Sequence, residues 1–153
     1  MENKQLNTSI LHCTIIKNII DKGYAPELPE LTELFDASED EILRALQRLQ
    51  DEHGVVLHPN SAKIWVVHPF SLAPTNFLLS DGEMEWWCNC AWCSLGAAAL
   101  LARDVTITTT IGANDRQIKM HITSGQVVET GLYVHFPIPM HQAWDNVIYT
   151  CST

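Results

Sequence analysis

The stretch Trp86–Leu101, WWCNCAWCSLGAAALL, places three indoles and three thiols directly before a run rich in alanine and leucine. Alanine and leucine are the strongest helix formers, so we expect a helix near Ala91–Ala102. Cys90 and Cys93 are three positions apart, and a helix that begins near Cys90 puts both sulfurs on one face. The positive end of the helix dipole lowers the pKa of a thiol there. The stretch therefore predicts a reactive thiol pair at the start of a helix.

Alternating apolar and polar residues surround this helix and indicate strands. Residues 104–112 and 117–125 alternate on both sides of a turn signal at Asn114-Asp115, which predicts an antiparallel hairpin. Residues 131–138 and 145–153 are rich in β-branched and aromatic side chains and are predicted to form two more strands. The second half of the chain is thus expected to be a helix packed on a small, mostly antiparallel sheet, which makes the fold class α+β.

The first seventy residues have a different pattern, with three helical segments followed by a hairpin. Helices are predicted over residues 10–23, 29–36 and 37–54, and a hairpin over residues 55–67. This order is that of a winged helix-turn-helix. We therefore expect a winged-helix-like domain at 1–70, a connector at 71–80 and a thiol-site domain at 81–153.

The third of these helices argues against a role in reading DNA. A capping box of Ser38 and Glu41 starts it, Gly54 ends it, and an apolar stripe is expected at Ile42, Leu43, Leu46 and Leu49. Its charged residues are mostly acidic: Glu39, Asp40, Glu41, Asp51 and Glu52 against Arg44 and Arg48. Such a helix would repel phosphates. A structural or partner-docking module is the preferred interpretation.

The composition supports this view for the whole chain. The 153 residues carry a formal net charge of −9 with only nine lysines and arginines, which argues against a nucleic-acid partner. No apolar run is long enough for a membrane span, and the first residues lack a secretory pattern, so a cytoplasmic location is expected. In that compartment the five cysteines are expected to be reduced thiols rather than disulfides.

The remaining cysteines and histidines differ in what they can contribute to a thiol site. Cys151 could complete a soft-metal site with the Cys90/Cys93 pair, whereas Cys13 stands alone in an isoleucine-rich helix and is expected to be an ordinary apolar residue remote from that site. A structural zinc site normally needs a second pair of cysteines or matching histidines. The histidines that follow, His121, His135 and His141, are scattered and are expected to be surface residues.

Two short segments resemble the organomercurial (alkylmercury) lyase family. The sequence Asn89-Cys90-Ala91-Trp92 with Leu95 and the later Ala102-Arg103 resembles the active-site segment of these enzymes. Residues 143–153, AWDNVIYTCST, resemble the segment with their second essential cysteine. The resemblance implies a winged-helix-like region followed by a mercury-binding thiol site.

The resemblance also implies roles for individual residues. Cys90 and Cys151 would be the thiolates that capture the mercury of R–Hg⁺. The family has an aspartate as proton shuttle three residues after the first cysteine, and here that position is Cys93. A thiol can hold a proton at neutral pH and is also a soft ligand, so Cys93 could be the proton relay or a third ligand. Trp86, Trp87 and Trp92 could shape an apolar pocket, with Cys88 beside them.

Three functions remain open on this sequence. The leading hypothesis is a lyase that cleaves R–Hg⁺ to RH and Hg²⁺ without an organic cofactor. The alternative is a non-catalytic thiolate protein that binds a soft metal ion such as mercury, copper or zinc. The third is a winged-helix regulator that responds to metals or thiols, which the acidity of the chain disfavours. An organomercurial or a soft metal ion is the expected partner, rather than nucleic acid or a membrane.

Overall fold

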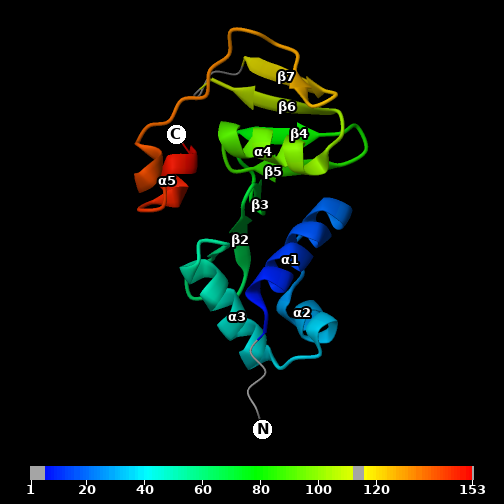
Figure 1. Ribbon diagram of the computed structural model, residues 1–153, viewed down its shortest axis with the longest axis vertical. Helices are drawn as coiled ribbons and strands as arrows, with labels where there is room; N and C mark the ends of the chain where they lie inside the picture. Colours follow the sequence, from blue (N-terminus) through cyan, green and yellow to red (C-terminus); the bar gives the residue numbers. More distant parts are fainter. Residues whose placement is uncertain (1–5, 112–115, 153) are drawn as a thin grey trace. The chain divides into compact units, whose positions relative to one another are not determined.

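The computed structural model describes residues 6–111 and 116–152 (Figure 1). The chain divides into two compact units, Met1–Val67 and His68–Thr153. Both combine helices with antiparallel strands, so the expected α+β class is confirmed. Within the described residues, every helix is too short or too polar to cross a bilayer.

The first unit contains the three expected helices and the expected hairpin. The helices are α1 (Thr8–Lys22), α2 (Leu28–Phe35) and α3 (Glu39–Asp51), and α3 contacts both of the others. The hairpin pairs β1 (Val56–Leu57) with β2 (Ile64–Val67) in antiparallel fashion. Its identification as a winged helix stays a prediction.

The start of α3 follows the expected local signal, whereas its end and its apolar stripe differ from the prediction: α3 ends at Asp51 with Glu52 as the cap, before Gly54. The capping box of Ser38 and Glu41 is present at the start of α3. The buried stripe consists of Ile42, Ala45, Leu46 and Leu49. Leu43 is exposed, which corrects the expectation, because it lies one position off the 3–4 spacing that faces the core.

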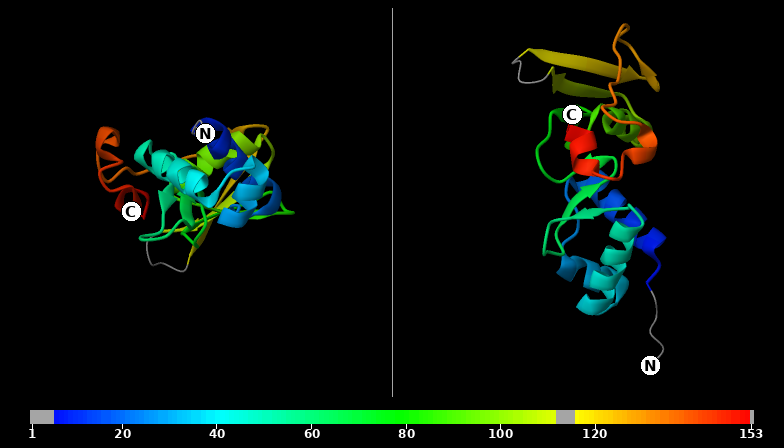
Figure 2. Two further views of the ribbon diagram at one scale, coloured as in Figure 1. Left: turned by 90° about the horizontal axis from the view of Figure 1, so that it is seen from below. Right: turned by 90° about the vertical axis from the view of Figure 1, so that its left-hand side faces the viewer.

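The second unit is built on six strands in the order β3–β5–β4–β6–β7–β8. Their bounds are β3 (Phe70–Ser71), β4 (Phe77–Ser80), β5 (Glu85–Cys88), β6 (Val105–Thr110), β7 (Gln117–Thr123) and β8 (Gln126–Val127). All five neighbouring pairs are antiparallel. The pair β6–β7 is the predicted hairpin, seen from the side in Figure 2, and its predicted turn at Asn114-Asp115 lies outside the described residues.

The predicted helix after the thiols is present as α4 (Ala91–Leu101), and it packs on β3, β4 and β5 (Figure 1). Its buried side includes Ala97, Ala98 and Leu101. Small residues let the helix lie close to the sheet. The packing fixes the direction in which the start of α4 points.

The C-terminal segments differ from the prediction. Residues 131–138 form no strand, since Pro137 cannot donate to a ladder and Pro139 follows it to begin the short helix η1 (Met140–Gln142). The last segment is the helix α5 (Val147–Ser152) instead of a strand. Its β-branched residues suggested a strand, but the side chain of Asn146 accepts the N–H of Tyr149 at 3.0 Å, which favours a helical start.

Candidate functional site

The start of α4 is capped by a cysteine. The chain leaves β5 at Cys88, and Cys90 adopts an extended conformation (φ −157°, ψ 179°) as the N-cap residue. The Cys90 Sγ accepts the N–H of Cys93 at 3.4 Å, and the Cys90 carbonyl accepts the N–H of Ser94 at 2.9 Å. The sulfur thus occupies the place of a capping oxygen, at the positive end of the helix dipole.

Three thiols from two separate segments meet at this point. The Cys90 sulfur is hydrogen-bonded to the thiols of Cys151 and Cys93. Cys93 lies in the first turn of α4 and is 8% exposed, while Cys90 and Cys151 are half-buried. The structure therefore brings together the three cysteines that the sequence singled out, Cys151 being supplied by α5 rather than by a strand.

The hydrogen bonds divide the protons unequally among these sulfurs. The pKa of Cys90 is lowered to about 3, because the thiols of Cys151 and Cys93 donate to its sulfur and the N–H groups of Cys93 and Trp92 add to this. The hydrogen bond to Cys90 raises the pKa of Cys151 to about 12. Hydrogen bonds to Cys151 and Cys90, together with burial, raise the pKa of Cys93 far above the range of an ordinary thiol. At neutral pH the cluster holds one thiolate, Cys90, and two protonated thiols.

The two other cysteines lie elsewhere. Cys88 is fully buried in β5, opposite Phe70 and Phe77, and burial raises the pKa of its thiol to about 12. It is therefore a core residue of the sheet. Cys13 is exposed on α1 of the first unit.

The three indoles of the predicted pocket have different surroundings. Trp86 is only 3% exposed and packs under the guanidinium of Arg103 at 6.0 Å. Trp87 is half-buried in β5. Trp92, two residues after Cys90, is 57% exposed and meets the ring of Phe136 edge-on at 6.0 Å. Trp86 therefore belongs to the core, and Trp92 is the indole that solvent reaches at the start of α4.

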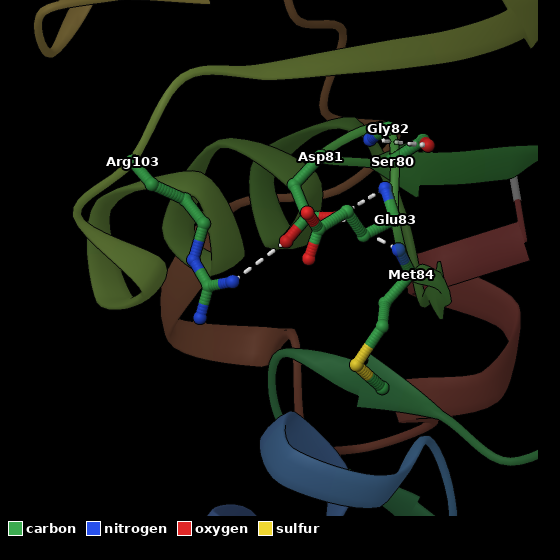
Figure 3. A network of polar contacts seen from close by, with 6 residues as sticks. All are labelled: Ser80, Asp81, Gly82, Glu83, Met84 and Arg103. Atoms are coloured by element: carbon green, nitrogen blue, oxygen red, sulfur yellow. Dashed lines mark hydrogen bonds and ion pairs between the residues drawn. The ribbon is translucent and has the colours of Figure 1, made fainter.

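The far end of α4 is held by a network of polar contacts (Figure 3). Arg103 donates to the carboxylate of Asp81 at 2.6 Å, and the same carboxylate accepts the N–H groups of Glu83 and Met84. Burial raises the pKa of Asp81, but these donors outweigh it, so the net pKa lies below that of an ordinary aspartate. Arg103 thus ties the segment after α4 to the turn between β4 and β5.

His68 is a member of the cluster that sequence reasoning missed. Its Nδ1 lies 3.6 Å from the Cys93 Sγ and 3.3 Å from the Asn89 Nδ2. Potential ligand atoms of His68, Cys93 and Cys151 all lie within 4.8 Å of one another. The ring of Trp144 meets His68 edge-on at 4.9 Å.

Strand pairing explains why His68 lies there. Phe70 pairs with Cys88, and the N–H of Asn89 continues the ladder to the Pro69 carbonyl at 3.3 Å. The antiparallel register then brings His68 opposite the residues that start α4. In the sequence, His68 is a histidine two positions before the short strand β3. Its relation to the cysteines becomes apparent only when β3 is known to pair with β5, the strand that leads to Cys90.

The three histidines that were expected to be surface residues are exposed, and the metal-ligand group of His68, Cys93 and Cys151 includes none of them. His121 forms an ion pair with Glu129 at 2.5 Å on the sheet. His135 and His141 are exposed.

Comparisons with known proteins identify the family of this chain and a similar fold. The family model for alkylmercury lyase (MerB) matches residues 70–153, which is more than half of the chain. The fold is similar to the crystal structure of the mercury-bound form of MerB2, with a TM-score of 0.66 and 20% identity over 81% of this chain. This chain covers 59% of the chain in that structure. No curated protein gave a significant match. The family match confirms the resemblance seen in the sequence, and the chain belongs to the alkylmercury lyase family.

Proposed function

We propose that this protein captures organomercurials R–Hg⁺ with Cys90 and Cys151 and cleaves their carbon–mercury bond with the proton of Cys93. The observation that carries the proposal is the cluster of three cysteine sulfurs at the start of α4, and the lowered pKa of Cys90 beside the raised pKa of Cys93 and Cys151 supports it. Mercury is a soft ion, and thiolates are its preferred ligands. Membership of the alkylmercury lyase family and the fold of mercury-bound MerB2 support the same substrate class.

Each sulfur has a distinct task in this reaction. The Cys90 thiolate attacks mercury first, because it alone is deprotonated at neutral pH. Cys151 then binds as the second sulfur and transfers its proton to the medium. Cys93 keeps its proton longest and gives it to the carbon that leaves mercury.

Bonds, protons and electrons balance in this cleavage step. The C–Hg bond breaks, its electron pair takes the Cys93 proton to form RH, and mercury remains as Hg²⁺ on the thiolates. The Cys93 thiolate that results can join as a further ligand. No electron is gained or lost by the protein in these steps.

Hydrocarbon release tests the proposal directly. Wild-type protein with phenyl- or methylmercury and excess thiol should release benzene or methane, measured by headspace gas analysis. Cys93→Ser should still bind the organomercurial but lose hydrocarbon release by about 100-fold or more, which is the usual contribution of a positioned acid. Cys93→Asp restores the acid that the family resemblance implies and should match or exceed the wild type. Absence of hydrocarbon from the wild type between about pH 6 and 9, on both sides of the usual thiol pKa, contradicts cleavage.

A second candidate is a non-catalytic protein that binds a soft metal ion, such as mercury or copper. The proximity of Cys93 to both His68 and Cys151 favours it, because Cys93 can then act as a ligand rather than an acid. This function predicts tight Hg²⁺ binding that weakens in Cys93→Ser, without hydrocarbon from any variant. The same three proteins therefore distinguish a lyase from a metal-binding protein.

A further inference from the structure

His68 adds a nitrogen donor to the thiol cluster. Its Nδ1 lies 3.6 Å from the Cys93 Sγ, and its ligand atom lies within 4.8 Å of that of Cys151. Capture of mercury by two sulfurs does not need an imidazole. One imidazole with two or three thiolates is instead a donor set that suits Zn²⁺, which binds both sulfur and nitrogen.

The spacing of these atoms fits a tetrahedral ion. With Zn–S bonds of about 2.3 Å and Zn–N bonds of about 2.0–2.1 Å, a sulfur and a nitrogen on one zinc lie roughly 3.6 Å apart. The Cys93 sulfur and the His68 nitrogen are already at 3.6 Å. The Cys151 sulfur needs only a small movement of its side chain to complete a triangular face.

The imidazole is oriented for such a role. The amide nitrogen of Asn89 lies 3.3 Å from His68 Nδ1 and can only donate, so Nδ1 is the ring nitrogen without a hydrogen, and a bound ion would take over the lone pair that Asn89 now contacts. The edge contact with Trp144 restricts the ring. Asn89 itself follows β5, which pairs with β3 directly after His68 and Pro69. Ordered strands and not a free loop therefore hold the donor in place, as ligand preorganisation requires.

We propose that His68, Cys93 and Cys151 bind Zn²⁺, with the sulfur of Cys90 as the fourth ligand. The Cys90 sulfur accepts hydrogen bonds from both other thiols, but it is outside the set of ligand atoms that lie within 4.8 Å of one another, so its side chain would have to move toward the ion to take that position. Binding replaces the protons of the Cys93 and Cys151 thiols, which pass to the medium. Zinc would occupy the sulfurs that capture mercury, so it would be a reversible inhibitor and protector of the thiol site. The inference rests on the thiol site of the proposed function, but zinc binding is measured without turnover.

The test uses the full-length reduced protein and the metal alone. Co²⁺ serves as a spectroscopic probe, and Zn²⁺ affinity follows from its displacement of Co²⁺. The wild type should bind one Co²⁺ with thiolate charge-transfer bands and strong tetrahedral d–d bands. His68→Phe keeps a ring against Trp144 but removes the donor, and it should weaken Zn²⁺ binding by at least about 100-fold, the upper end of the effect of outer-shell partners. His141→Phe, an exposed histidine of the same unit, should bind as the wild type does.

A second variant distinguishes loss of the nitrogen donor from loss of the fold. His68→Cys supplies a fourth sulfur, so it should regain Zn²⁺ affinity with a stronger charge-transfer band, and circular dichroism should show the wild-type fold. Equal Zn²⁺ affinity in the wild type and a folded His68→Phe overturns the proposal, as does failure of His68→Cys to regain affinity while folded. Hydrocarbon release is a separate measurement: its absence contradicts the lyase and leaves the zinc result standing. Zinc that binds without slowing phenylmercury capture overturns the inhibitory role.

Discussion

The two ends of α4 are held in opposite ways. At its far end, a carboxylate, a guanidinium and two backbone N–H groups satisfy one another through Asp81 and Arg103 (Figure 3). At its start, the capping position is a cysteine, whose sulfur accepts the N–H of Cys93 and the hydrogen bonds of two neighbouring thiols. Serine, threonine, asparagine and aspartate are the strong helix caps, so Cys90 is not the residue that stability alone would select. The polar groups are fully paired where the helix is anchored, whereas the preference for an oxygen cap is broken where the chemistry is proposed.

This contrast explains what holds the thiol cluster in position. The thiols contribute weak hydrogen bonds, which do little to fix a helix. The packing of α4 on β3, β4 and β5 and the anchor at Arg103 hold the helix instead. Substitutions at the start of α4 should therefore change mercury binding more than stability. Substitutions at the far end of α4 should change stability more than mercury binding.

The largest effect is expected for Cys90→Ser. Loss of the thiolate should reduce retention of phenylmercury against excess competing monothiol by at least about 100-fold, since a hydroxyl is a hard and poor ligand for mercury. Serine is a better helix cap than cysteine, so the midpoint of thermal unfolding should not fall. Equilibrium dialysis and circular dichroism measure the two quantities.

The exposed Cys13 provides the matched control. Cys13→Ser should leave phenylmercury retention unchanged, because a single thiol cannot hold mercury against an excess of competitor. If Cys90→Ser retains phenylmercury as well as Cys13→Ser does, the start of α4 is not the capture site.

Much of the fold could be predicted from the sequence, because periodicity and caps are local signals. Helix α3 with its capping box and the β6–β7 hairpin follow from such patterns. Helix α5 could not be predicted in this way, because its β-branched residues favour a strand and the deciding contact is the side chain of Asn146. A six-residue helix depends on its surroundings more than on propensity.

The site residues could be predicted from the sequence only where they are close together in the chain or where the sequence resembles a known family. The spacing of Cys90 and Cys93 indicated a shared face, and the family resemblance added Cys151. His68 depends on the pairing of β3 with β5, a contact between residues that are about twenty positions apart. Sequence patterns without that register give no reason to select it over His121, His135 or His141.

A moderate effect on stability is expected at the anchored end. Asp81→Ala removes the partner of Arg103 and the acceptor of two N–H groups, and should lower the free energy of unfolding by about 2 kcal/mol. Asp81→Asn keeps an acceptor oxygen and should cost about 1 kcal/mol or less, since Arg103 is half-exposed and its ion pair is screened. Chemical denaturation measures both values, and phenylmercury retention should hardly change.

The difference in the free energy of unfolding between wild type and Asp81→Ala should depend on pH in a definite direction. The folded pKa of Asp81 is lowered, so the unfolded chain binds the proton more readily and the stabilisation is fully present above the unfolded value of about 3.9. It is lost as pH falls through the folded pKa. The gap between wild type and Asp81→Ala should therefore shrink in acid, and a gap that widens there would contradict the role given to the carboxylate.

The smallest effects are gains in stability, and the first is expected at the residue that ends α4. Ala102 is exposed and has a left-handed conformation (φ 51°, ψ 37°) with its N–H bonded to the Ala98 carbonyl at 3.2 Å. An L-residue with a Cβ is strained there by about 1 kcal/mol, whereas glycine is not. Glycine also gains freedom in the unfolded chain, which offsets part of this benefit. Ala102→Gly should therefore stabilise the protein by about 0.5 kcal/mol.

Gly96→Ala within the same helix should stabilise the protein by a similar amount. Here the change from glycine to alanine is favourable because alanine favours the helix and the new Cβ would lie 3.9 Å from Pro69, without a clash. Unfolding by urea distinguishes these gains from zero, and a loss in Ala102→Gly would show that the end of α4 is not strained.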